Sequence, residues 1–205
     1  MAHSRWSTPL TSFATTLTLL FAGAASAGIH TWDVNEVFSN ADGSIQFVEL
    51  WEANGGATEI NVGNGSITSD TQSFSFGQGQ VAGPTTNKYY LLGTAGFAAL
   101  DGAPTPDAII PAGSVPFFDT TGDTVSFGTY DSFTFGTVPT NGTDSLEKTG
   151  ITTNSPTNYA GATGSVNAAP PPSPVPSLSH PALWLVAALL LASVLLIPRR
   201  ARARA

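Results

Sequence analysis

Carboxylates are the side chains of this sequence with the widest chemical scope. The chain has 205 residues, with fourteen Asp and Glu, three His and no Cys. The lack of Cys excludes a thiol nucleophile, a disulfide scaffold and a Cys-ligated metal site. A Ser–His–Asp triad or a zinc site needs well-placed His residues, and only His30 lies between residues 28 and 169. Paired carboxylates are therefore the remaining route to catalysis.

Four acids near the start of the predicted domain form the candidate set for a metal or catalytic site: Asp33, Glu36, Asp42 and Glu49. One interpretation is a Ca²⁺ site, since Ca²⁺ prefers carboxylate and carbonyl oxygens, or the acid–base pair of a glycoside hydrolase. The other is that Glu36 and Glu49 accept hydrogen bonds from loop amides and fix the fold. We favour the second, and predict no resident cofactor and no catalytic residues.

Two predicted strands, residues 31–38 and 44–51, must position these acids. A hairpin closed between Phe38 and Ser44 sets the register of the pair. Like charges directly opposite each other destabilise a sheet, so a cation or a shared proton would relieve such a pair. The expected cross-strand pairs are Asp33 with Glu49 and Glu36 with Gln46.

Regular alternation along these strands predicts which side chains share a face. The first strand places Trp32, Val34 and Phe38 on the same face as Glu36. The second strand, residues 44–51, is apolar on both faces, which is typical of a central strand. Acidic side chains on such apolar strand faces need hydrogen-bond partners or a raised pKa.

Short runs rich in Val, Ile, Phe, Tyr and Thr, separated by Gly, Pro, Asn and Asp, continue along the chain and predict an all-β domain. A single short helical turn is predicted at residues 94–100. Eight strands at this spacing favour a β-sandwich. The further predicted strands are residues 66–68, 71–76, 88–92, 124–127, 132–135 and 144–148.

Residues 1–27 have the pattern of a secretory signal peptide, with a basic start and an apolar centre. Ala25 and Ala27 form a small-x-small cleavage site, which makes Gly28 the expected first residue of the mature protein. The alternative is a buried helix or an anchor that is not cleaved.

The C-terminal end predicts a membrane anchor. Residues 182–197 are apolar except for one serine, and a helix of that length nearly crosses a bilayer. Basic residues on one flank place the following tail, residues 198–205, in the cytoplasm and the domain outside. The alternative is a core helix. The basic residues are Arg199, Arg200, Arg202 and Arg204.

A Pro-rich linker, residues 168–181, precedes this helix and favours extended polyproline II structure. Val175, Pro176, Ser177 and Leu178, followed by an apolar helix and an arginine cluster, resemble the PEP-CTERM-type sorting signals, in the variant whose motif reads Ile-Pro-Thr-Leu. The resemblance implies a bacterial source and processing by an exosortase-like membrane protease. The alternative is a plain anchor that is never processed.

Residues 28–167 carry a second resemblance. The segments WDVNEV (32–37) and QFVEL (46–50), then TGDTVSF (121–127) and SLE (145–147), are similar to the strands of a lamin-tail-like domain. This resemblance covers about residues 30–148. It implies an immunoglobulin-like β-sandwich of a secreted or surface protein that is used for binding.

Charge separates the parts of the chain. All fourteen acids lie from Asp33 to Glu147, with Lys88 and Lys148 as the bases of that stretch. An acidic domain is not expected to bind nucleic acid. The sequence thus predicts an exported, membrane-tethered or cell-surface module that binds a glycan or a protein. A secreted carbohydrate hydrolase and a calcium-dependent adhesion module are the alternatives.

Overall fold

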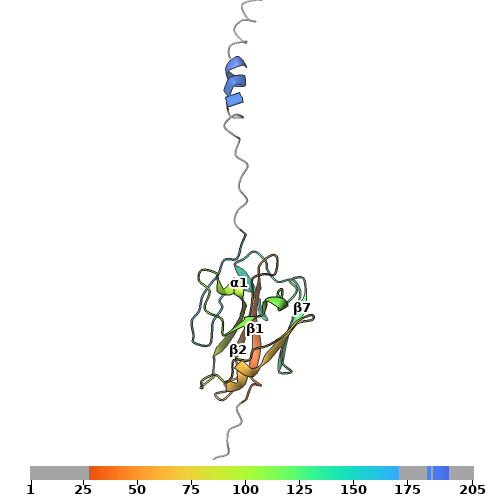
Figure 1. Ribbon diagram of the computed structural model, residues 1–205, viewed down its shortest axis with the longest axis vertical. Coiled ribbons are helices and arrows are strands. Elements are labelled where there is room, and N and C mark those ends of the chain that lie inside the picture. Colours follow the sequence, from red (N-terminus) through yellow and green to blue (C-terminus); the bar gives the residue numbers. More distant parts are fainter. Residues whose placement is uncertain (1–27, 171–183, 186, 194–205) are drawn as a thin grey trace, which may run out of the picture. The chain divides into compact units, whose positions relative to one another are not determined.

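The computed structural model describes residues 28–170, 184–185 and 187–193 (Figure 1). The chain divides into two compact units, Met1–Ala169 and Pro170–Ala205. Several predicted features lie outside the described residues. These are the signal helix with Ala25 and Ala27, the sorting motif Val175, Pro176, Ser177 and Leu178, and the basic residues Arg199, Arg200, Arg202 and Arg204.

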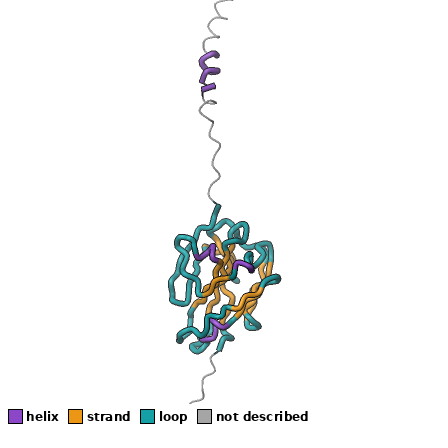
Figure 2. Tube along the Cα trace, in the orientation of Figure 1, coloured by secondary structure: helices purple, strands orange, loops and turns teal. Residues whose placement is uncertain are grey.

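The first unit is built from two β-sheets joined by long loops (Figure 2). The larger sheet has the strand order β10-β9-β1-β2-β5-β6 and the smaller has the order β4-β3-β7-β8. The strands of the larger sheet are β1 (Trp32–Ser39), β2 (Gln46–Glu52), β5 (Tyr89–Thr94), β6 (Ala108–Ile110), β9 (Asp144–Glu147) and β10 (Gly150–Thr153). Those of the smaller sheet are β3 (Ser66–Thr68), β4 (Ser73–Ser75), β7 (Asp123–Phe127) and β8 (Asp131–Phe135).

The eight predicted strands are confirmed, with ends that differ by up to two residues. The predicted helical turn is α1 (Ala95–Ala98), and the Thr94 hydroxyl accepts the Phe97 N–H at its start. Two strands were not predicted, β6 and β10. Both are short edge strands, and β10 begins at a glycine, so neither carries a clear alternating pattern.

A β-bulge interrupts the pairing of β1 with β2. Val34 lies opposite Leu50, but the next pair is Glu36 with Glu49, which leaves Asn35 without a partner in β2. The turn is also longer than expected, because Ser39 is already paired with Gln46. The predicted pairs, Asp33 with Glu49 and Glu36 with Gln46, are therefore wrong. Asp33 lies opposite Trp51 instead.

This bulge also changes which side chains share a face, because one extra residue reverses the alternation beyond it. Trp32, Val34 and Val37 belong to the same hydrophobic cluster. Phe38 belongs to a different cluster. The prediction that Glu36 shares a face with Trp32 is therefore wrong: the bulge places Val37, not Glu36, among the core residues of β1.

The main hydrophobic core contains buried side chains from both sheets, so the two sheets pack on each other. Burial of such side chains is the main force that holds the unit together. Members from the larger sheet include Val37 and Leu50, and members from the smaller sheet include Ile67, Val125 and Phe127.

A second cluster lies on the other face of the larger sheet, because Phe47 and Val48 are adjacent in β2 and point to opposite faces. Its buried members are Phe38, Phe47, Leu91, Phe97, Val166 and Ala168. The prediction that β2 is buried on both faces is confirmed. Residues 154–169, which we call the closing segment, contribute the last two members and cover part of this face.

The second unit is described at residue 170 and at residues 184–185 and 187–193, and the backbone of the latter two stretches is helical. Its described apolar side chains, among them Trp184 and Leu190, are exposed. Within these described stretches, none of the helices has the length and apolar character needed to cross a bilayer. The predicted membrane helix, residues 182–197, is therefore only partly described.

Candidate functional site

Two of the candidate acids hold the closing segment on the larger sheet. The Ser155 N–H donates to Glu36 Oε1 at 3.0 Å, and the Thr157 N–H donates to Glu49 Oε2 at 2.6 Å. The Asn35 amide donates to Glu49 Oε1 at 2.8 Å. Both glutamates are buried. They therefore act as acceptors for backbone and side-chain donors that the closing segment and the bulge bring to them.

Asp107 repeats this arrangement just before β6. Its Oδ2 accepts the Tyr159 N–H at 2.9 Å and the Leu91 N–H at 2.8 Å. One carboxylate oxygen thus joins the closing segment to β5. The Asp107 N–H in turn donates to the Leu91 carbonyl.

The three N–H donors belong to alternate residues, 155, 157 and 159. In an extended chain, N–H groups two residues apart point in the same direction. The acceptors come from β1, from β2 and from the residue before β6. The closing segment therefore crosses several strands and directs its donors at the sheet. The carboxylates satisfy backbone N–H groups at these partly buried contacts.

Asn154 fixes the start of the closing segment to its end. Its buried amide donates to the Thr143 carbonyl at 2.7 Å and to the Val166 carbonyl at 2.8 Å. The Val166 N–H donates back to Asn154 Oδ1 at 2.8 Å. These bonds position Val166 within the second cluster, so polar and apolar contacts hold the same segment.

Burial controls the ionisation of these acids. It raises the pKa of Glu49 to about 8, and the nearby Glu36 carboxylate adds to the increase. Burial also raises the pKa of Glu36, although hydrogen bonds from Ser145 and Ser155 act in the opposite direction. The pKa of Asp107 is raised by burial as well. A carboxyl with a pKa of about 8, as for Glu49, is largely protonated at neutral pH.

The structure separates the four candidate acids. Glu36 and Glu49 are direct cross-strand neighbours. Asp33 is half-exposed opposite Trp51, and Asp42 is exposed in the turn between β1 and β2. Across the described residues, His, Asp and Glu form no group of three or more that could hold a metal ion. The interpretation that Glu36 and Glu49 accept hydrogen bonds from loop amides is confirmed.

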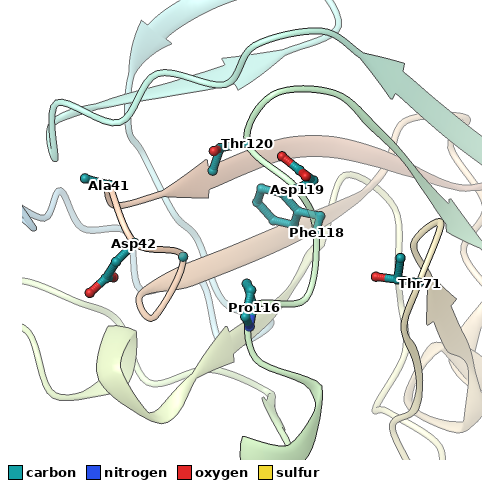
Figure 3. Close-up of a pocket in the computed structure, with 8 residues that line it drawn as sticks. Ala41, Asp42, Thr71, Pro116, Phe118, Asp119 and Thr120 are labelled. Carbon is teal, nitrogen blue, oxygen red and sulfur yellow. The ribbon is translucent and has the colours of Figure 1, made fainter.

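A shallow surface cleft of about 270 Å³ lies beside the turn that carries Asp42 (Figure 3). Phe118 and Pro116 lie between the turn with Asp42 and the β3–β4 turn with Thr71. The cleft is lined by Ala41, Asp42, Gly43, Thr71, Pro116, Phe118, Asp119 and Thr120.

Two buried polar side chains hold the walls of this cleft. Asp123, the first residue of β7, accepts the Asp70 N–H at Oδ1 and the Asp119 N–H at Oδ2, both at 2.8 Å. Gln46 accepts the Phe117 N–H at 2.6 Å and donates to the Phe118 carbonyl at 2.9 Å. The walls are thus fixed before any ligand binds.

The cleft carries negative charge. Hydrogen bonds from the Ser44 side chain and N–H lower the pKa of Asp42, and those from the Thr121 N–H and hydroxyl lower the pKa of Asp119. Both side chains are exposed and ionised at neutral pH. The sequence placed Asp42 among the candidates but did not identify the role of Gln46. A polar residue in an otherwise apolar strand was the available signal.

Comparisons of the chain with protein-family models, with curated proteins and with solved structures find no match. The chemistry of the site therefore has to be argued from the residues of this chain. Its two parts are a buried set of acceptors beneath the closing segment and an acidic cleft at the surface.

The raised pKa of Glu49 predicts how stability depends on pH. Between about 4.5 and about 8 the folded state binds more protons than the unfolded state, so the free energy of unfolding falls as pH rises through this window. We expect Glu49→Gln to flatten that dependence in urea unfolding curves. Asp101→Asn, at an exposed loop residue, serves as the control. A native protein whose stability rises from pH 5 to pH 8 contradicts the prediction.

Proposed function

We propose that this protein is an exported, membrane-tethered module that binds a ligand and does not catalyse a reaction. In this proposal the first unit is a lamin-tail-like domain with an immunoglobulin-like β-sandwich fold, placed outside the cell by the N-terminal leader. Residues 182–197 cross the membrane, and the tail that follows lies in the cytoplasm until an exosortase-like protease processes the chain.

The non-catalytic part of the proposal rests on the hydrogen bonds that the buried Glu36 and Glu49 accept. A glycoside hydrolase needs two carboxyl groups that flank a substrate in an accessible site. Glu36 and Glu49 are 0% and 1% exposed, and their oxygens are occupied by Ser155, Thr157 and Asn35. Carboxyl groups that accept hydrogen bonds from the protein's own backbone therefore have a structural role in the fold.

Strand pairing supports the lamin-tail-like interpretation. The segments 32–37 and 46–50 that carry the resemblance fall in neighbouring antiparallel strands. Glu36 of the first motif and Glu49 of the second lie directly opposite each other. A common task explains the pair, because each supplies an acceptor for the closing segment.

The closing segment supports the tether. It ends at residue 169, within the first two residues of the Pro-rich linker, residues 168–181. Carboxylates at three places and the Asn154 amide hold it to the folded unit. A domain attached to a membrane through its C-terminal end requires such a firm connection at that end.

The cleft indicates the class of ligand. Ionised Asp42 and Asp119 accept hydrogen bonds, Thr71 and Thr120 provide hydroxyls, and the exposed Pro116 contributes an apolar surface. Hydroxyl-rich ligands such as saccharides match this mixture. The volume of about 270 Å³ is at the lower limit for small-molecule sites. The cleft therefore fits a sugar unit of a longer glycan.

We expect the purified protein to bind saccharides on a glycan array through this cleft. Asp119→Asn removes the charge and retains the Oδ1 acceptor for Thr121, so the fold is kept while affinity falls about tenfold, in line with loss of a charge-assisted hydrogen bond. Asp101→Asn, which does not line the cleft, is the matched control.

Absence of binding to every saccharide, with or without added Ca²⁺, contradicts the glycan part of the proposal. Binding that requires Ca²⁺ and is lost in Asp119→Asn identifies a calcium-dependent adhesion module instead. Binding that survives in Asp119→Asn places the ligand elsewhere on the surface.

Processing of the C-terminal end has its own test. Intact-mass measurement of protein from the cell envelope and from the medium is expected to show a form that lacks residues 198–205 in the surface fraction. A mature protein that retains Arg199, Arg200, Arg202 and Arg204 in both fractions contradicts cleavage and leaves a permanent membrane anchor.

A further inference from the structure

Gly28, the first described residue of the domain, is held in place by backbone hydrogen bonds. Its N–H donates to the Thr58 carbonyl at 3.0 Å, and its own carbonyl accepts the Asn61 N–H at 3.1 Å. The residue is buried. The first residue of the domain is therefore held on both sides by residues 58–61, whereas terminal residues are usually loosely attached.

Glu59 brings a carboxylate to the same position. A Cβ atom placed on Gly28 would lie 2.1 Å from Glu59 Oε1 and 2.5 Å from Oε2. With bond lengths of about 1.5 Å, the nearer oxygen lies within about 5 Å of the Gly28 nitrogen. The carboxylate is fixed there because Oε2 accepts the His30 N–H at 2.6 Å. A glycine permits this approach, and a side chain at position 28 would displace the carboxylate.

The charged groups around this carboxylate are few. The His30 imidazole lies 3.8 Å from Glu59 Oε2 and is largely exposed. The neighbouring acid, Glu52, accepts the Gly56 N–H at 2.8 Å and is committed to that loop. The Glu59 carboxylate thus lies beside both the exposed His30 imidazole and the backbone of Gly28.

We propose that this position binds the new amino terminus that is formed when the leader is removed. Hydrolysis of the Ala27–Gly28 bond by a signal peptidase adds one water, leaving a carboxylate on Ala27 and an α-ammonium group on Gly28. The ammonium has three donors in place of one. It keeps the bond to the Thr58 carbonyl and forms an ion pair with Glu59.

This inference rests on the proposed export, and it adds a consequence: maturation stabilises the folded domain. An ammonium whose pKa is raised by a carboxylate contributes stability below the ordinary pKa of an α-amino group, which is about 8, and loses it as pH rises through the folded value. A polypeptide that continues upstream of Gly28 lacks this charge.

The test uses four proteins that all end at Ala205 and are purified in detergent. The chain begins either at Gly28 or at Ala25, and each version carries either Glu59 or Glu59→Gln. Gln keeps an oxygen for the His30 N–H, so the local fold is retained. Thermal unfolding midpoints are measured at pH 7.5 and at pH 10.5, and the exported protein is sequenced from its amino terminus.

At pH 7.5 we expect the chain that begins at Gly28 to unfold about 4 °C higher than the chain that begins at Ala25. The difference disappears with Glu59→Gln and at pH 10.5, where the amine is neutral. An equal difference in the Glu59→Gln pair, or none in the native pair, overturns the ion pair and leaves the proposed function standing. An exported protein that begins at another residue overturns maturation at Gly28, whatever the midpoints show.

Discussion

Capture of backbone N–H groups by buried carboxylates is the interaction on which this fold depends. Removing a carboxylate from water is unfavourable, and this burial, together with the nearby Glu36, raises the pKa of Glu49. Leaving the partly buried donors of the closing segment without acceptors would also be unfavourable. Glu36, Glu49 and Asp107 resolve both problems together, because each places its oxygens against donors from residues 155–159.

The bulge at Asn35 makes this arrangement compatible with a packed core. Without it, regular alternation would put Glu36 among the apolar side chains that face the smaller sheet. The extra residue sends Val37 to that core and leaves Glu36 opposite Glu49. The unpaired Asn35 then donates its side-chain amide to Glu49. One local irregularity thus supplies an acceptor, a donor and a core residue.

Sequence patterns predicted the β architecture and the task of Glu36 and Glu49, because alternation and buried acids are local properties. They did not predict the register. Turn length and the bulge depend on how Val37 packs against the other sheet, which a single strand does not encode. The parts played by Gln46 and Asp123 were equally hidden, since Gln46 binds the Phe117 N–H 71 residues away and Asp123 binds the Asp70 N–H 53 residues away.

Amide hydrogen exchange at the closing segment tests the central claim most directly. The account predicts slow exchange at Ser155, Thr157 and Tyr159, whose N–H groups donate to side-chain carboxylates and not to a paired strand. It also predicts a selective increase at Thr157 in Glu49→Leu, which removes both carboxyl oxygens. Exchange of the Thr157 amide at the rate of an unprotected peptide in the native protein would contradict it, because the carboxylate would then not be holding the segment.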